Sequence, residues 1–163
     1  MRNKFRIIGV SLAAMAGLLL VSGVAWANPN KTPVSGQLVS YRVTDPGERW
    51  IDDDGVLHIR NEWVRVRYVG DIWGRSVAIL NSNRDPSTGD GDMHGSFVFN
   101  GYVGEDWVSA TGRLAGVRSG VWEVDFVWHT DDGRLIKTTE VTRGTGGPPW
   151  DYVGEILDPP GRR

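Results

Sequence analysis

The stretch WEVDFVWHTDDGRLIKTTEV, residues 122–141, contains the clearest strand and the clearest turn of the chain. Before the turn, residues of two kinds alternate: Trp122, Val124, Phe126 and Trp128 on one face, Glu123, Asp125 and His129 on the other. A period of two is typical of a strand with one buried face. Residues 130–133 end in Asp-Gly, which is typical of a hairpin turn, and residues 135–141 follow as the return strand. The stretch predicts an antiparallel hairpin whose core face carries two tryptophans.

The same alternation recurs along the chain, in short runs separated by Gly and Asp, and a helical period is not found outside the N-terminal segment. Strands are predicted at residues 39–43, 56–59, 64–68, 72–80, 97–103, 107–115, 122–129, 135–141 and 150–157. Neighbouring strands joined by short turns favour a meander that closes on itself. We therefore predict an all-β fold, a single antiparallel β-barrel of about eight strands over residues 36–158, with a two-sheet β-sandwich as the alternative.

The N-terminal segment has the features of a signal peptide. Three basic residues precede an apolar run from Ile7 to Val24, and residues 25–27, Ala-Trp-Ala, supply a small-x-small cleavage site. We predict a cleaved signal peptide at residues 1–27, a flexible lead-in at 28–35 and a C-terminal tail at 159–163. An uncleaved anchor is the alternative, because the apolar run approaches the roughly 20 residues that span a bilayer.

The composition limits the cellular compartments and the classes of partner that fit this chain. Of 18 Lys and Arg, three lie in the leader, so cleavage would leave 15 against 20 Asp and Glu, a formal net charge of −5. This excess of acid argues against nucleic acid or an anionic membrane surface as a partner. The chain has no cysteine, which excludes disulfides, thiol chemistry and cysteine metal sites. We predict a secreted or periplasmic protein that is not membrane-bound after cleavage.

The stretch NSNRDPSTGDGDMH, residues 81–94, is the least strand-like part of the chain, and we predict a long loop there. One interpretation is a loop that closes on itself through Asx turns and glycines. A second is a calcium site at Asp85, Asp90 and Asp92, although the spacing does not match an EF-hand.

A third interpretation makes the loop a lid over a cavity, with Arg84, Asp90, Asp92 and His94 as candidates. No hydrolase elbow, P-loop or dinucleotide motif occurs, and the three histidines lack the spacing of metal ligands. We therefore assign no catalytic residue, metal ligand or cofactor. Glu123, Asp125 and Glu140 are interpreted as a solvated face of their hairpin.

Two segments carry a resemblance to a known family. GRSVAILNSNRDP, residues 74–86, followed by GDGDMHGSFVFNG, residues 89–101, resembles uncharacterised secreted bacterial proteins of the allene oxide cyclase barrel-like group, whose relatives include dirigent proteins. The resemblance implies a small barrel with a cavity for an apolar or aromatic molecule. No position matches a catalytic residue of those enzymes, so the resemblance implies no mechanism.

An eight-stranded barrel is wide enough to be filled by side chains or to hold one ligand. Small residues on two predicted strands would leave room: Gly74, Ser76, Ala78, Ala110 and Gly112. The predicted ligand-binding residues are Tyr41, Tyr68, Phe99, Trp122 and Trp128.

We predict non-covalent binding of a small apolar or aromatic molecule in the barrel. One alternative is a cyclase or isomerase acting in the same cavity. The other is a carbohydrate-binding module that uses Trp63 and Trp73, which fall out of phase with the apolar faces of their strands. The sequence does not determine the oligomeric state.

Overall fold

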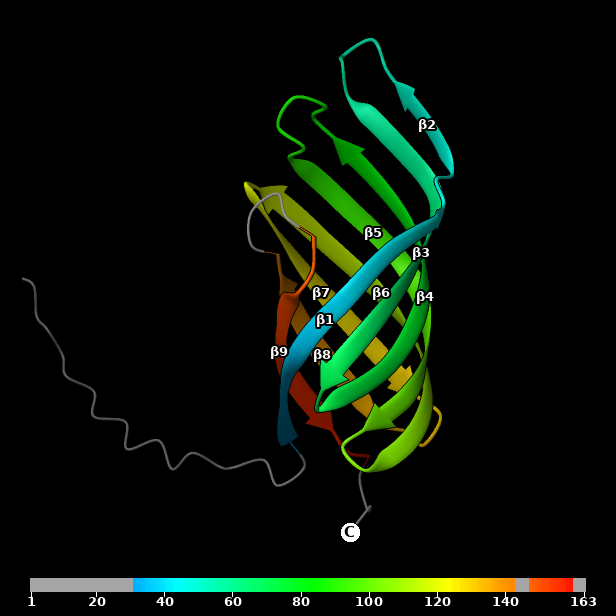
Figure 1. Ribbon diagram of the computed structural model, residues 1–163, viewed down its shortest axis with the longest axis vertical. Coiled ribbons are helices and arrows are strands. Elements are labelled where there is room, and N and C mark those ends of the chain that lie inside the picture. The colour runs from blue at the N-terminus through cyan, green and yellow to red at the C-terminus, as the bar shows by residue number, and fades with distance from the viewer. Residues whose placement is uncertain (1–30, 143–146, 160–163) are drawn as a thin grey trace, which may run out of the picture.

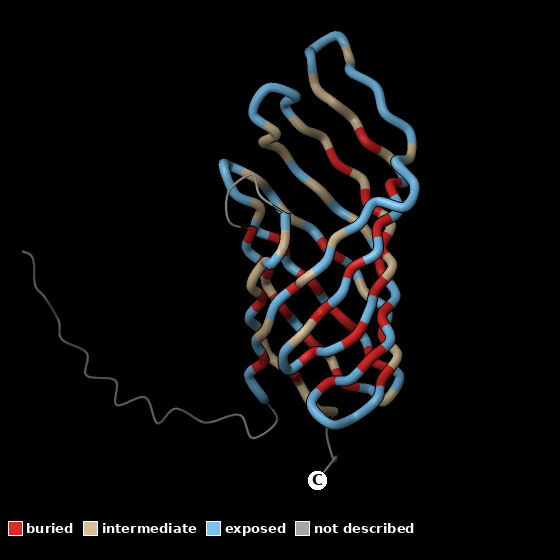
Figure 2. Tube along the Cα trace, in the orientation of Figure 1, coloured by how far each residue is buried: buried red, intermediate tan, exposed pale blue. Residues whose placement is uncertain are grey.

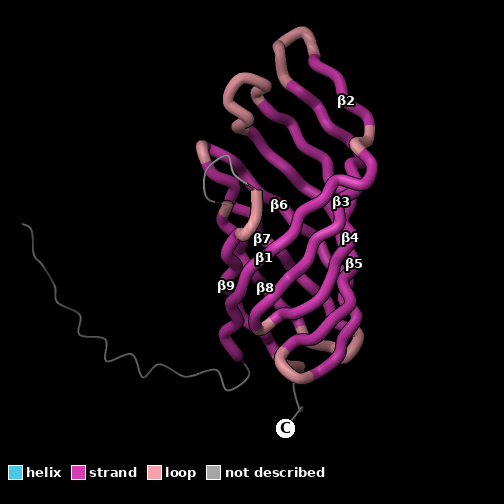
Figure 3. Tube along the Cα trace, in the orientation of Figure 1, coloured by secondary structure: helices cyan, strands magenta, loops and turns pink. Residues whose placement is uncertain are grey.

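The computed structural model describes residues 31–142 and 147–159, and these residues form strands and turns without a helix (Figure 3). The nine strands are β1 (Lys31–Asp45), β2 (Glu48–Ile51), β3 (Leu57–Gly70), β4 (Ile72–Arg84), β5 (Gly91–Val103), β6 (Asp106–Ser119), β7 (Val121–Thr130), β8 (Leu135–Val141) and β9 (Trp150–Leu157). The prediction of an all-β fold is confirmed.

Eight of the strands close into an antiparallel barrel. Strands β3 to β9 follow one another as a meander, and β1 lies between β9 and β3 and closes the ring (Figure 1). The short β2 pairs with the first part of β3, beyond the rim of the barrel. Closure leaves no edge strand in the barrel wall. The barrel prediction is therefore confirmed, and the sandwich alternative is excluded.

The N-terminal boundary of the barrel differs from the prediction. Residues 31–35, assigned above to a flexible lead-in, belong to β1 and pair with β9, with Pro33 opposite Glu155 and Ser35 opposite Val153. The predicted signal peptide and most of the tail lie outside the described residues. Within residues 31–142 and 147–159, no helix is long and apolar enough to cross a membrane.

Strand β1 also changes which of its side chains face inward. A bulge between Leu38 and Ser40 lets both Leu38 and Tyr41 point into the barrel. The strand predicted at 39–43 therefore does not keep one inward face throughout, because Val43 is 40% exposed.

The two ends of the barrel differ in how they are filled. We call the end with the 70–71, 104–105 and 131–134 turns the closed end, and the opposite end, with turns 85–90 and 119–120, the mouth. Buried residues are dense near the closed end, whereas the hairpins that rise above the mouth are mostly exposed or half-buried (Figure 2).

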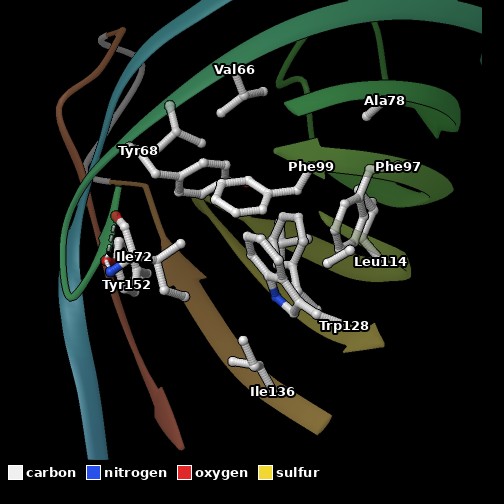
Figure 4. Packing of buried hydrophobic residues seen from close by; sticks show 14 of the residues in the cluster. Val66, Tyr68, Ile72, Ala78, Phe97, Phe99, Leu114, Trp128, Ile136 and Tyr152 are labelled. Atoms are coloured by element: carbon white, nitrogen blue, oxygen red, sulfur yellow. Dashed lines mark hydrogen bonds between the residues drawn. The ribbon is translucent and has the colours of Figure 1, made fainter. Parts of the chain in front are cut away.

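Aromatic rings pack the closed half of the barrel (Figure 4). Trp128 is fully buried, and its ring lies edge-on to Phe97, Phe99 and Tyr68, with centroid separations of 4.8, 5.2 and 5.4 Å. Trp128 Nε1 donates a hydrogen bond to Thr138 Oγ1 at 3.1 Å, so the buried indole is satisfied. Edge-to-face pairs of this kind stabilise a core beyond the burial of their area.

The predicted small residues explain why these rings fit. A Cβ added at Gly112 would overlap the Phe97 ring, and one at Gly74 would lie 2.8 Å from Phe99 Cε2. The space left by these two glycines is therefore filled by aromatic side chains. Ser76 and Ala78, further along β4, line open space instead.

A hydrogen bond of Tyr152 and the ion pairs of Arg134 stabilise the closed end. Tyr152 Oη accepts a hydrogen bond from the Ile72 backbone N–H at 2.8 Å, which ties β9 to the turn between β3 and β4 (Figure 4). The buried Arg134 side chain pairs with Asp132 at 2.7 Å and with Asp106 at 3.2 Å. The closed end is therefore densely packed, and open space inside the barrel lies toward the mouth.

Candidate binding cavity at the mouth of the barrel

A cavity of about 420 Å³ occupies the mouth half of the barrel. This volume lies within the range of small-molecule sites. The walls are mainly apolar and come from β1 and β3 to β7: Leu38, Val64, Val66, Ala78, Leu80, Phe97, Leu114, Val124 and Phe126.

One ionisable side chain is buried inside this apolar space. Glu140 on β8 is only 3% exposed and lines the cavity. Burial raises the pKa of Glu140 to about 8, so its carboxyl group holds a proton at neutral pH. The side chain therefore sits in the cavity as a neutral carboxylic acid.

Glu140 belongs to a short polar network. The Tyr68 hydroxyl hydrogen-bonds to the Glu140 carboxyl group and to Ser76, and burial raises the pKa of Tyr68 well above its usual value. Glu140 Oε1 is buried and has no hydrogen-bond partner within the described chain. Buried polar atoms are nearly always satisfied, so this oxygen is free to accept or donate a hydrogen bond to a group that enters the cavity, such as a ligand or a water molecule.

The position of Glu140 corrects the interpretation of its hairpin as a solvated face. The turn at 130–133 places Ile136 opposite Trp128 and, four residues later, Glu140 opposite Val124. Trp128 and Val124 face the core, so Glu140 faces it too. Glu123 and Asp125 are exposed, as predicted.

Two arginines lie at the mouth. The Arg84 guanidinium stacks on the Trp122 ring at 5.1 Å from its centroid, a cation–π contact, and Arg84 Nε donates to Ser82 Oγ at 3.0 Å. Arg118 Nε is buried without a hydrogen-bond partner among the described residues, and Asp90 Oδ1 lies 4.0 Å away. Two arginine side chains therefore lie at the mouth, next to an apolar interior.

The predicted 14-residue loop is much shorter in the structure. Residues 81–84 and 91–94 continue β4 and β5, with Asn81 opposite His94 and Arg84 opposite Gly91. The loop prediction is wrong at both ends, because the paired residues are polar and carry no apolar alternation. Only residues 85–90 form the turn, and residues 86–89 border the cavity.

The turn at 85–90 folds on itself, as one interpretation predicted. Asp85 Oδ1 accepts hydrogen bonds from Ser87 N at 2.7 Å and from the Ser87 hydroxyl, and these bonds lower the pKa of Asp85. Asp90 Oδ1 accepts from Gly120 N at 2.8 Å, which joins this turn to the neighbouring one. Both carboxylates hold the rim of the mouth in place.

The other lid and calcium candidates do not gather at the cavity. Asp92 is exposed and its carboxylate accepts from Asn83 Nδ2 at 3.1 Å, while His94 is exposed and does not line the cavity. Of the four lid candidates, only Arg84 lines the cavity. No group of three His, Asp or Glu side chains suited to a metal ion is found in residues 31–142 and 147–159.

The five predicted ligand-binding residues divide between the two halves of the barrel. Tyr41 and Trp122 line the cavity. Tyr41 Oη donates to Glu62 Oε2 at 3.3 Å, and its ring lies 5.4 Å from that of Trp150, which also lines the cavity. Tyr68, Phe99 and Trp128 belong to the packed aromatic cluster, where Tyr68 reaches the cavity through its bond to Glu140.

The two out-of-phase tryptophans lie on the outer wall. Trp63 is 43% exposed and Trp73 is 46% exposed. Trp73 begins a row of exposed aromatic rings, with Tyr102 at 5.9 Å and Trp107 at 5.0 Å from Tyr102. A shallow depression of about 650 Å³ lies beside Trp63, over β4 to β7.

Comparison of the chain with models of known protein families gives no match, and comparisons with curated proteins and with solved structures give none either. The similarity to the allene oxide cyclase barrel-like group therefore remains a prediction from the motif at residues 74–101. The function has to be argued from the cavity itself.

Proposed function

We propose that the protein binds a small, largely apolar or aromatic molecule in the mouth half of its barrel. The observation that carries the proposal is the buried, protonated Glu140 carboxyl group, whose Oε1 has no hydrogen-bond partner among the described residues, inside an apolar cavity of about 420 Å³. A protonated carboxyl group both donates and accepts hydrogen bonds, so it suits a hydroxyl or carbonyl group on the ligand. The predicted leader supports an activity outside the cytoplasm.

The proposal is tested by filling the cavity without disturbing the wall. Ala78→Leu adds a larger apolar side chain on the cavity lining of β4, and Ala115→Leu makes the same change at an exposed position of β6. The probe is 1-anilinonaphthalene-8-sulfonate, followed by its fluorescence, with tryptophan quenching as a second readout. We expect Ala78→Leu to abolish saturable probe binding and Ala115→Leu to preserve it. Equal binding by the two variants would contradict the proposal.

A second candidate is an enzyme of cyclase or isomerase type in the same cavity. Glu140 and the Tyr68 hydroxyl form a hydrogen-bonded pair in an apolar site, and a carboxyl group with a pKa near neutrality is suited to donating and recovering a proton. An isomerisation needs no further reactant. In this case Glu140→Gln would retain ligand binding and lose turnover, whereas a pure binder would show no turnover in either form.

A further inference from the structure

The outer wall of the barrel carries a compact group of arginines remote from the cavity interior. Arg42 on β1 lies opposite Arg65 on β3, and Arg67 on β3 lies opposite Arg75 on β4. All four side chains are exposed, while the intervening residues of β3 point into the core. We refer to these four residues as the arginine patch.

No acidic side chain of the described residues forms a salt bridge with the patch. The remaining cross-strand neighbours are not acidic: Arg65 also faces Val77, Arg67 also faces Ser40, and Arg75 also faces Asn100. Like charges directly opposite one another destabilise a sheet. A protein with a net charge of −2 nevertheless places four cations together here, which indicates an anionic partner.

An exposed tryptophan stands at each end of the patch. Trp63 precedes Arg65 by two residues on β3, and Trp73 precedes Arg75 by two residues on β4, so each shares the outer face with its arginine. From the strand register, the row of Trp63 and the row of Trp73 are three steps apart, about 20 Å along the strands. The patch covers three strands and is about 10 Å wide.

This shape suits a single linear chain better than a broad surface. A membrane or a duplex would also face the acidic remainder of the protein, whereas one polymer strand contacts only the narrow strip. Arginine binds carboxylate and sulfate groups through paired N–H donors, and a tryptophan ring offers a flat apolar face to a sugar ring. We propose that this strip binds an acidic polysaccharide, laid along β3 and β4 between Trp63 and Trp73.

The proposal is independent of the cavity. The arginine patch lies on the outer side of the barrel wall, whereas the cavity is lined by the inner side of the same wall. The probe is polygalacturonate, with dextran as the neutral polymer, and affinity is measured by electrophoresis of the folded protein through gels that contain each polymer. Arg67→Gln removes one charge from the patch. Lys137→Gln removes one charge from an exposed position of β8 and serves as the matched control.

We expect binding to polygalacturonate and none to dextran. Arg67→Gln should lower the affinity about 5- to 30-fold, the double variant Arg65→Gln/Arg67→Gln should abolish retardation, and Lys137→Gln should leave it unchanged. Trp73→Ala should also weaken binding to polygalacturonate. The salt dependence of the binding should stay unchanged in this variant, because no charge is removed. Circular dichroism checks that each variant is folded.

Equal loss in Arg67→Gln and Lys137→Gln would overturn the proposal, because it would show a response to overall charge alone. Tighter binding to phosphatidylglycerol vesicles or to single-stranded DNA than to polygalacturonate, lost in Arg65→Gln/Arg67→Gln, would also overturn it in favour of a lipid or nucleic-acid partner. If the fluorescent probe does not bind in the cavity but polygalacturonate still retards the protein, the polysaccharide proposal stands. That result would contradict only the proposal of ligand binding in the cavity.

Discussion

The closed end and the mouth of the barrel are built from the same eight strands, but their interiors are opposites. At the closed end, glycines on β4 and β6 face the rings of Phe99 and Phe97, so the space they leave is filled. At the mouth, Ser76 and Ala78 face open volume, and a buried acid, Glu140, lines the same space. The comparison shows that small inward residues leave a cavity only where no aromatic ring packs over them.

The largest expected effect concerns the acid in the mouth half. The pKa of Glu140 is raised from 4.5 to about 8, so the folded state keeps a proton that the unfolded chain releases. The free energy of unfolding should therefore fall as pH rises from about 4.5 to about 8, by on the order of 5 kcal/mol in total. Glu140→Gln should remove this pH dependence and be the more stable protein at pH 8. Urea unfolding at pH 5 and pH 8.5 measures both, and parallel curves for the two proteins would contradict the burial of a protonated acid.

Next in size is the removal of a ring from each half. Trp128→Ala at the closed end should lower the free energy of unfolding by about 3–5 kcal/mol, because a fully packed ring leaves a void. Trp122→Ala at the mouth should cost less, since this ring is half-buried, but it should weaken binding of the fluorescent probe. Urea unfolding and probe titration of both variants test the contrast. An equal loss of stability would mean that the mouth is packed as densely as the closed end.

Enlarging a small inward side chain tests the two halves in the other direction. Gly112→Ala would overlap the Phe97 ring and the Val127 carbonyl group and should cost about 1–3 kcal/mol. Ala78→Leu enters open volume and should leave stability unchanged or raise it by about 0.5–2 kcal/mol. Thermal melting compares them, and destabilisation of both by the same amount would rule out a hollow mouth.

The smallest expected effect lies on the rim beyond the mouth. His58 Nε2 and Asp52 Oδ2 are 2.7 Å apart in the β2–β3 hairpin, and this bond raises the pKa of His58 and lowers that of Asp52. NMR titration should place His58 above its ordinary pKa of 6.5. Asp52→Asn should move it back down, with the barrel's melting temperature unchanged. An unchanged His58 titration in that variant would show that the ion pair is not formed in solution.

Much of this architecture follows from the alternation of apolar and polar residues. Most strands were predicted close to their positions because turns such as Asp-Gly separate them, and the inward face of β7 was assigned correctly. However, β2 was not predicted, and the predicted strands at 56–59 and 64–68 form the single strand β3. Bulges in β1 escaped prediction, since an extra residue reverses the alternation without any signal in residue type. The extension of β4 and β5 beyond the barrel, at residues 81–84 and 91–94, was not predicted either. Strands outside the barrel wall need no apolar face, so the sequence there shows no apolar alternation.

The decisive residue of the cavity was present in the sequence but misplaced. Once the turn at 130–133 sets Trp128 opposite Ile136, counting four residues further puts Glu140 on the core face. Because glutamate is usually charged, Glu140 was predicted to face solvent. The register of the hairpin instead places it on the core face. The volume of the cavity was beyond prediction, because it depends on which aromatic rings pack over which glycines of the neighbouring strands.

The closure of the barrel by β1 has a consequence for how the chain reaches its native state. Lys31 on β1 pairs with Glu155 on β9, 124 residues later, so the seam cannot form until nearly the whole described chain has been synthesised. Until then the meander has two open edges, which are prone to pairing with other chains. Contacts of such long range also slow folding. A protein joined in this way stays unclosed until its last strand has been synthesised.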